Sequence, residues 1–475
     1  MIDFSITNTL AEFITKQDYA SLPEDVIHET KRGVLDILGC ALGSLELDKG
    51  KIGVEFAGRS GGKSEATILG NGEKTSIPMA AFANGELMDA MDYDALLPPA
   101  HVAPFVTSAV LAMAETRKAS GKDFITAVVL AHDISSRIGI SLGSHSTFSQ
   151  GILRSFGFGC NVFGAASGAA SIMKLDSEKT ADALGLAGYF APVPVRQKFM
   201  YTPNNGLQKY GPAGWTNQAG VTAAILAEMG ERGDRSVLDG DYGFWAMNGS
   251  SSCNWDAMTK NLGKDWMILQ SKYKCWPCDG QFQSPLSAFI KIIEDNSLKP
   301  EEIEQVIVKT ERTGGVPQFL KTEVYNHVDA QFSLFFNIAV AAHRVKLGPL
   351  WQARSTVENP SIRALMKKVK WEEYSRAEEM RHQELEVEHK SYLNSRPSYV
   401  EVNARGKVFT QTAEYAKWLS TETPGFRATD EDLINKFRAN AENALSTRKT
   451  EEAIDTIMNL EKVSDINDTI KTLVP

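Results

Sequence analysis

The most unusual part of the sequence is the segment from Asn84 to His101, NGELMDAMDYDALLPPAH, which gathers several side chains able to transfer protons. Asp89 and Asp92 stand three residues apart, a spacing that places both on one face of a helix. Like charges on one face are unfavourable unless they are exposed, paired with cations or used in a reaction. We expect Pro98-Pro99 to stop the helix, so that His101 follows a rigid turn and could act as an acid or base near neutral pH.

Ordinary structural roles could explain the same residues. Asp89, Asp92 and Asp94 could form a solvated acidic helix end, because charged side chains are usually exposed. A single histidine such as His101 is more often a structural hydrogen-bonding residue than a catalyst. The spacing alone leaves both interpretations open.

A glycine- and proline-rich loop holds a lysine that could bind an anion. The segment 206–220, GLQKYGPAGWTNQAG, places Lys209 just before a helical run. Such a loop can bring backbone amides and a lysine to an anionic group. A surface lysine is the ordinary alternative.

Two other motifs give little support for a metal, redox or dinucleotide site. Cys275 and Cys278 form a CxxC motif, but no thioredoxin-like context and no second pair of zinc ligands is visible nearby. Gly157-Phe158-Gly159 with Gly164 misses the GxGxxG spacing and follows no clear strand. We therefore expect no cofactor and no metal.

Helices must position the residues of the first part of the chain. Apolar positions recur at helical spacing from Pro23 to Gly43, and 102–118 and 122–139 predict two more helices. The small residues of 164–171, GAASGAAS, suit a central buried helix that others approach closely. Asp176 is a predicted N-cap of the next helix.

The pattern changes near residue 270. The segment 304–310 predicts a strand, 399–412 a hairpin that turns at Arg405-Gly406, and 329–343 a helix. After Pro424-Gly425 the chain is helical again. The order predicts a mainly α fold: a large all-helical domain with an inserted smaller α+β domain containing an antiparallel sheet. The predicted boundaries are 1–268 and 423–475 for the helical domain and 269–422 for the inserted one.

Composition narrows the function. The chain has 475 residues and a net charge of -9, from 59 acidic against 50 basic residues. Nucleic-acid binding is not expected, because it requires a basic surface. An enzyme for small anions remains possible if its cations are concentrated in one place.

The cysteines and the N-terminus predict a cytoplasmic protein. Five cysteines are a sparse, odd set for so long a chain, which is typical of a reduced compartment. The first residues, MIDFSITNTLAEFI, lack the positive charge of a signal or transit peptide. No window approaches 18 uncharged apolar residues, so we expect no membrane association.

The sequence resembles the MmgE/PrpD family over nearly its whole length. Its most specific match is NG–x3–DAMDYD, residues 84–94, followed by His101 and an apolar helix. Further matches are FGAASGAA from Phe163, YK–x2–P around Lys274 and AQFSLFF at 330–336. The resemblance implies a two-domain fold with the site in the cleft between the domains, a homodimer, and no metal or organic cofactor.

The resemblance also implies roles for individual residues. It makes Asp92 and His101 the groups that move protons at the carbon beside a carboxylate. Lys209 and Lys274 match the two active-site lysines, which would hold carboxylates of the substrate. Tyr210 is a further candidate, as a substrate-binding residue or a second acid or base.

Several positions depart from the family's pattern. The family's second histidine has no counterpart in 155–157, where Ser155 is a candidate substrate-binding residue. Arg154, just before it, could add a clamp for a carboxylate. Ala95 replaces the second aspartate of the pair, and Leu96 replaces the following threonine. Dehydration of 2-methylcitrate itself is therefore in doubt.

Three hypotheses about function remain. The first is a cofactor-independent lyase, a dehydratase or decarboxylase, that acts on a small di- or tricarboxylate. The second is an epimerase of a small dicarboxylate similar to iminodisuccinate, which needs acid/base groups on both faces of one carbon. The third is a non-catalytic relative that binds a carboxylate.

Overall fold

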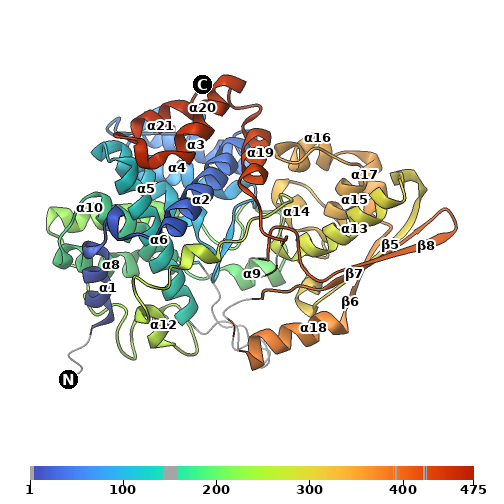
Figure 1. The fold of residues 1–475 in the computed structure, drawn as a ribbon, viewed down its shortest axis with the longest axis horizontal. Coiled ribbons are helices and arrows are strands. Elements are labelled where there is room, and N and C mark those ends of the chain that lie inside the picture. The colour runs from blue at the N-terminus through green and yellow to red at the C-terminus, as the bar shows by residue number, and fades with distance from the viewer. Residues whose placement is uncertain (1–4, 143–157, 389, 391–392, 421–422, 424) are drawn as a thin grey trace.

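The computed structural model describes residues 5–142, 158–388, 390, 393–420, 423 and 425–475. Its N-terminal part is built almost entirely of helices (Figure 1). They are α1 Ile6–Lys16, α2 Glu24–Gly43, α3 Asp48–Ser60, α4 Ile77–Ala90, α5 Ala103–Arg117, α6 Gly121–Ser141, α7 Asn161–Ile172, α8 Ser177–Phe190, α9 Arg196–Tyr201, α10 Ala213–Met229, α11 Phe244–Met247 and α12 Trp255–Thr259.

Helix α7 lies at the centre of these helices, as the small residues of its sequence predict. It contacts α5, α6, α8 and α10. Gly164 explains the closest approach: a Cβ added there would lie 2.0 Å from the Ser135 Oγ and 2.2 Å from the Ala131 carbonyl oxygen, both on α6. Helix α6 is long and apolar enough to span a membrane, but 94% of its most apolar 18-residue stretch is buried inside the fold. Its place is therefore that of a core helix.

The part after residue 270 contains the sheet (Figure 1). Its strands are β5 Ile303–Thr310, β6 Val369–Glu373, β7 Ser398–Ala404 and β8 Lys407–Ala413, and its helices are α13 Gln283–Asp295, α14 His327–Phe332, α15 Leu334–Ala342, α16 Arg354–Val357, α17 Pro360–Met366 and α18 Ser375–His382. The strand order is β6-β5-β7-β8, and α13 packs against β7 and β8.

This sheet is mixed, not purely antiparallel as predicted. The hairpin β7–β8 turns at Arg405-Gly406 as expected, and β5 pairs with β7 in antiparallel fashion. Strand β6, however, runs parallel to β5, with Val306 opposite Val369. Strand β6 was not predicted, because VKWEE is short and mostly charged, and only one of its residues is buried.

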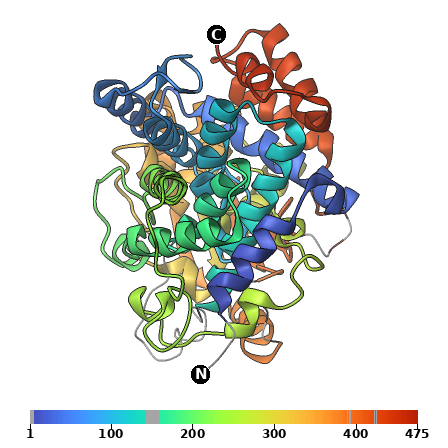
Figure 2. The same cartoon turned by 90° about the vertical axis from the view of Figure 1, so that its left-hand side faces the viewer.

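The C-terminal helices pack against the N-terminal helices. Helices α19 Asp430–Ala441, α20 Thr447–Met458 and α21 Asn467–Thr472 lie toward the top of Figure 1. Helices α19 and α20 both contact α2. The rotated view in Figure 2 shows the same red helices against the blue ones. This is where the predicted return segment would lie, and the division of the chain into domains stays a prediction.

Candidate active site

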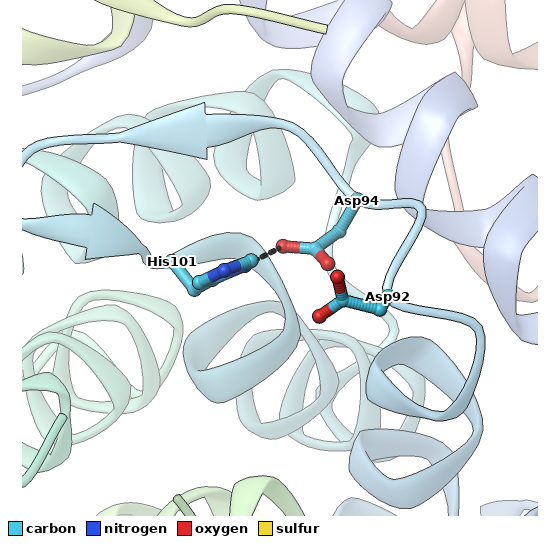
Figure 3. Close-up of side chains that lie close together, drawn as sticks. All are labelled: Asp92, Asp94 and His101. Carbon is cyan, nitrogen blue, oxygen red and sulfur yellow. Dashed lines mark hydrogen bonds and ion pairs between the residues drawn. The ribbon is translucent and has the colours of Figure 1, made fainter. Parts of the chain in front are cut away.

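The acidic segment does not form the helix end that its spacing predicts. Helix α4 stops at Ala90, well before Pro98-Pro99, and Asp92 has a left-handed backbone, φ 52°. The chain then forms a small hairpin of β3 Leu96–Leu97 and β4 Ala100–His101 around the two prolines. This turn places Asp92, Asp94 and His101 beside one another (Figure 3). All are buried, so the alternative of a solvated acidic helix end is wrong.

Asp92 is enclosed by two lysines and a tyrosine. Its carboxylate lies 2.8 Å from the Lys274 Nζ and 3.1 Å from the Lys209 Nζ, and it accepts a 2.6 Å hydrogen bond from the Tyr210 hydroxyl. The side chains of Asp92 and both lysines have no exposed surface. Burial alone would raise the pKa of Asp92, but Lys274, Lys209 and then His101 lower it well below its usual range. Asp92 is therefore held as an anion.

Asp89 completes the same charge cluster from the last turn of α4. It lies 3.0 Å from the Lys209 Nζ and 2.5 Å from the Nζ of Lys49, a buried lysine of α3. Burial would raise the pKa of Asp89, but Lys209 and Lys49 lower it. Burial would likewise lower the pKa of Lys49, but Asp89 and Glu86 raise it. The acidic group is thus matched by cations, as a buried group of carboxylates requires.

His101 is oriented by a carboxylate and an aromatic ring. Its Nδ1 lies 2.8 Å from the Asp94 carboxylate, the pair joined by the dashed line in Figure 3. Its ring stacks on Tyr210 with centroids 4.5 Å apart and an angle of 18° between the planes. Because Asp94 accepts from Nδ1, Nε2 is the ring nitrogen left to exchange a proton with a ligand. This is the arrangement of an oriented acid/base histidine, in contrast to an ordinary structural one.

Tyr210 connects the two halves of the cluster. Its hydroxyl lies 3.4 Å from the His101 Nδ1 and donates to Asp92. Burial first, and then Asp92 and Asp89, raise the pKa of Tyr210 well above its usual value. The phenol therefore stays protonated and acts as a hydrogen-bond donor.

Asp92, Asp94 and His101 also have the spacing of a metal-binding group, with ligand atoms within 4.8 Å of one another. The surroundings oppose a cation there, because the two lysines already neutralise Asp92. A divalent ion would have to displace an ammonium or lie beside one, which Coulomb repulsion makes costly. The donor set therefore fits a metal poorly.

A cavity of about 180 Å³ is lined by residues that neighbour this cluster in the sequence. The hairpin residues Leu96 to Ala100 form one wall, and Ala100 directly precedes His101. Arg196 and Tyr201 of α9 line it from the helical part of the chain, and Arg396 lines it from the sheet-containing part. Lys272, which also lines it, forms an isolated β-bridge with Leu96. The cavity thus lies between the two parts of the chain.

Comparison with known proteins identifies the family. The MmgE/PrpD N-terminal domain model matches residues 8–253, and the MmgE/PrpD C-terminal domain model matches 276–462. The chain belongs to the MmgE/PrpD family. Human cis-aconitate decarboxylase is 23% identical over 97% of this chain and 93% of its own length. The mouse protein of the same name is 24% identical over 98% and 92%.

A fungal relative matches a shorter region. The cis-aconitate decarboxylase-like protein oryM of Aspergillus oryzae is 24% identical over 61% of each chain. The three relatives named here all carry cis-aconitate decarboxylase in their names.

The structure brings together the candidates that can be placed. Asp92, His101, Lys209, Lys274 and Tyr210 are all in one buried cluster. Arg154 and Ser155 lie outside the described residues, so their predicted roles stay predictions. The CxxC cysteines are both buried beside the cluster, where burial first of all raises the pKa of the Cys275 thiol to about 12.

The sequence interpretation missed the residues that surround this cluster. They are Lys49, Asp36 and Lys436 in the protein interior and Arg196 and Arg396 at the cavity. A lysine or arginine far from the motif carries no local signal of its partner. Lys49 illustrates this, because its partner Asp89 is 40 residues away in the sequence and lies on another helix.

Proposed function

We propose that this MmgE/PrpD protein is a cofactor-independent lyase that removes carbon dioxide or water from a small di- or tricarboxylate. The observation that carries the proposal is His101, which Asp94 holds and Tyr210 stacks on, and which directly follows Ala100, a residue that lines the cavity. The names of the relatives favour decarboxylation of an unsaturated tricarboxylate such as cis-aconitate.

Decarboxylation would break the carbon–carbon bond to one carboxylate. Carbon dioxide leaves, the electron pair stays on the adjacent carbon, and conjugation with a second carboxylate spreads the charge. Protonated His101 then donates its Nε2 proton to a carbon of that anion, and solvent restores the proton. For dehydration, neutral His101 would instead remove the proton, the C–H electron pair would form the carbon–carbon double bond, and His101 would return that proton to the hydroxyl, which leaves as water. Both routes use one oriented acid/base group next to a carboxylate.

The two lysines would provide positive charge near the developing anion. Burial opposes protonation of Lys274, but Asp92, Asp94 and then Asp279 raise its pKa, so the ammonium stays charged. Fixed charges in a dry site stabilise a developing anion more strongly than charges in water do. In this proposal Asp92 keeps Lys274 charged and holds both lysines in place, and His101 transfers the proton. That role differs from the proton-transfer role that the family resemblance implies for Asp92.

The proposal includes the arrangement that the resemblance implies. The substrate would bind between the helical domain and an inserted domain of 269–422, and the enzyme would be a cytoplasmic homodimer. Analytical ultracentrifugation of the purified chain tests the dimer.

A substrate panel tests the function. The protein is incubated with cis-aconitate, citrate, 2-methylcitrate and a chiral dicarboxylate, and carbon dioxide, alkene absorbance and optical rotation are followed. Release of carbon dioxide or a new alkene supports the lyase. Inversion without a change of mass would replace it with the epimerase, and binding without turnover would replace it with a non-catalytic relative. His101→Asn is the control that must reduce any turnover found by about 100-fold or more.

A further inference from the structure

The buried lysines are badly placed to bind the substrate. The side chains of Lys209 and Lys274 have no exposed surface, and each ammonium already contacts the carboxylate of Asp92. Neither lysine is among the described residues that line the cavity. A carboxylate that enters the cavity therefore needs another cation.

The cavity supplies such cations from both sides. Arg196 lies on α9, and Arg396 lies just before β7, so the two guanidinium groups come from opposite parts of the chain. Burial lowers the pKa of Arg196, Asp279 and Tyr201 oppose that effect, and the charge of Arg396 lowers the pKa further. Two arginines that share a cavity can each offer a planar pair of N–H donors, the geometry that matches a carboxylate.

The described residues that line the cavity include more basic than acidic side chains. Arg196, Lys272, Arg381 and Arg396 line it, and among the described lining residues the only acid is Glu311. Arg381 forms a 2.7 Å ion pair with Glu378 of the same helix.

An anionic ligand in the cavity would have to share Arg396 with Glu311. Its side chain is only 3% exposed and contacts the Arg396 Nη1, and it accepts a 3.2 Å hydrogen bond from the Thr313 hydroxyl. A buried carboxylate beside an arginine can hold the guanidinium in position. It also competes with any anionic ligand for the same donors.

Much of the rest of the wall is hydrocarbon, although Gln281, Thr313 and Asn394 also line it. Pro98, Pro99, Leu97, Val316 and Leu419 all line the same cavity. A ligand therefore meets an apolar surface between the arginines and the hairpin that carries His101. This combination suits a carbon chain with a carboxylate at the end away from the reacting carbon.

We propose that Arg196 and Arg396 together bind a non-reacting carboxylate of the substrate, and that Glu311 holds Arg396 in the empty site and weakens anion binding. The inference rests on the proposed function, because it places the opposite end of the substrate near His101. It selects compounds with at least two carboxylates joined by a short hydrocarbon chain.

Binding of an unreactive probe tests this assignment directly. Propane-1,2,3-tricarboxylate is titrated calorimetrically into the full-length protein and into Arg196→Met, Arg396→Met and Glu311→Gln. We expect each arginine variant to bind about 10- to 100-fold more weakly, the effect of losing a charge-assisted hydrogen-bonding group. Glu311→Gln should bind more tightly, a gain that unfolding cannot produce.

Arg405→Met is the matched control. It removes the same charge from an arginine that is paired with Glu302 and lies outside the cavity lining. The assignment is wrong if the probe binds Arg196→Met and Arg396→Met as it binds Arg405→Met, or if Glu311→Gln does not bind more tightly.

The outcomes separate this inference from the proposed function. Turnover with an unchanged KM in both arginine variants overturns the arginine assignment and leaves the lyase intact. Arginine-dependent binding of the probe, with no turnover on the panel, supports the assignment and overturns the lyase. His101→Asn should keep the affinity for the probe while losing turnover.

Discussion

Lys436 of α19 donates a 2.6 Å hydrogen bond to the main-chain carbonyl oxygen of Tyr93, the residue that follows Asp92. The same ammonium lies 3.2 Å from the carbonyl oxygen of Lys274 and 2.7 Å from the carboxylate of Asp36. The C-terminal helices thus hold the two segments that meet at the Asp92–Lys274 ion pair. A buried cation of this kind acts on the site through the backbone.

Lys436→Met should therefore lower both stability and turnover. Removing one partner of a buried ion pair costs about 3–5 kcal/mol, because Asp36 is left buried without its cation. The remaining folded enzyme should show a lower kcat with a smaller change in KM, since Asp92 and Lys274 lose their fixed separation. Urea unfolding and kinetics below the transition give both numbers.

Arg137→Met is the matched control for Lys436. Arg137 is also buried, pairs with Asp133 at 2.6 Å and donates to the carbonyl oxygens of Lys260 and Asp265, away from the site. The Arg137→Met variant should lose a comparable free energy of unfolding and keep the wild-type kcat per folded molecule. Equal kcat in the two variants would show that Lys436 has only a structural role.

His101→Asn should reduce kcat by about 10²- to 10⁴-fold, the usual contribution of a positioned acid or base. Asp94→Asn keeps a side chain of the same shape but removes the charge that orients His101, so a smaller loss is expected. Steady-state kinetics on the substrate found by the panel measure both. A larger loss for Asp94→Asn than for His101→Asn would contradict the order of these roles.

Asp92→Asn tests whether this carboxylate is chiefly a counter-ion. The change leaves Lys274 and Lys209 buried with less compensating charge, which should cost about 3–5 kcal/mol of folding free energy. Tyr210→Phe, which removes one hydrogen bond to the same oxygen, should cost about 1 kcal/mol. Unfolding titrations at pH 7 compare the two. Equal losses would mean that the lysines do not depend on Asp92.

The sequence predicted the elements whose signal is local. The helix from Pro23 to Gly43, the hairpin of 399–412 and the cap at Asp176 all appear with nearly the expected bounds. Each depends on periodicity, a turn dipeptide or a capping side chain within a few residues. The gathering of Asp92, His101, Lys209 and Lys274 came from the family resemblance, since no spacing links residues so far apart.

What could not be predicted depends on contacts between distant segments. The left-handed turn at Asp92 ends α4 early because its carboxylate is held by Lys209 and Lys274, and neither lies near it in the sequence. Lys436 looks like any helix-surface lysine until Asp36 is placed opposite it. Strand β6 likewise forms only because it can pair with the edge of β5.

Burial of His132 should make the stability of the fold sensitive to acid. It is buried on α6, where burial lowers its pKa to about 4, against 6.5 when exposed, while its Nδ1 hydrogen-bonds the Val128 carbonyl oxygen. As the pH falls from 7 to 5, the unfolded chain therefore gains a proton that the folded chain does not. The folded state should lose about 2 kcal/mol of stability at this residue by pH 5. His132→Gln should remove that part of the pH dependence, measured as the difference between urea unfolding free energies at pH 7 and pH 5. His382→Gln, at an exposed position, is the control, and an equal effect of the two variants would contradict the assignment.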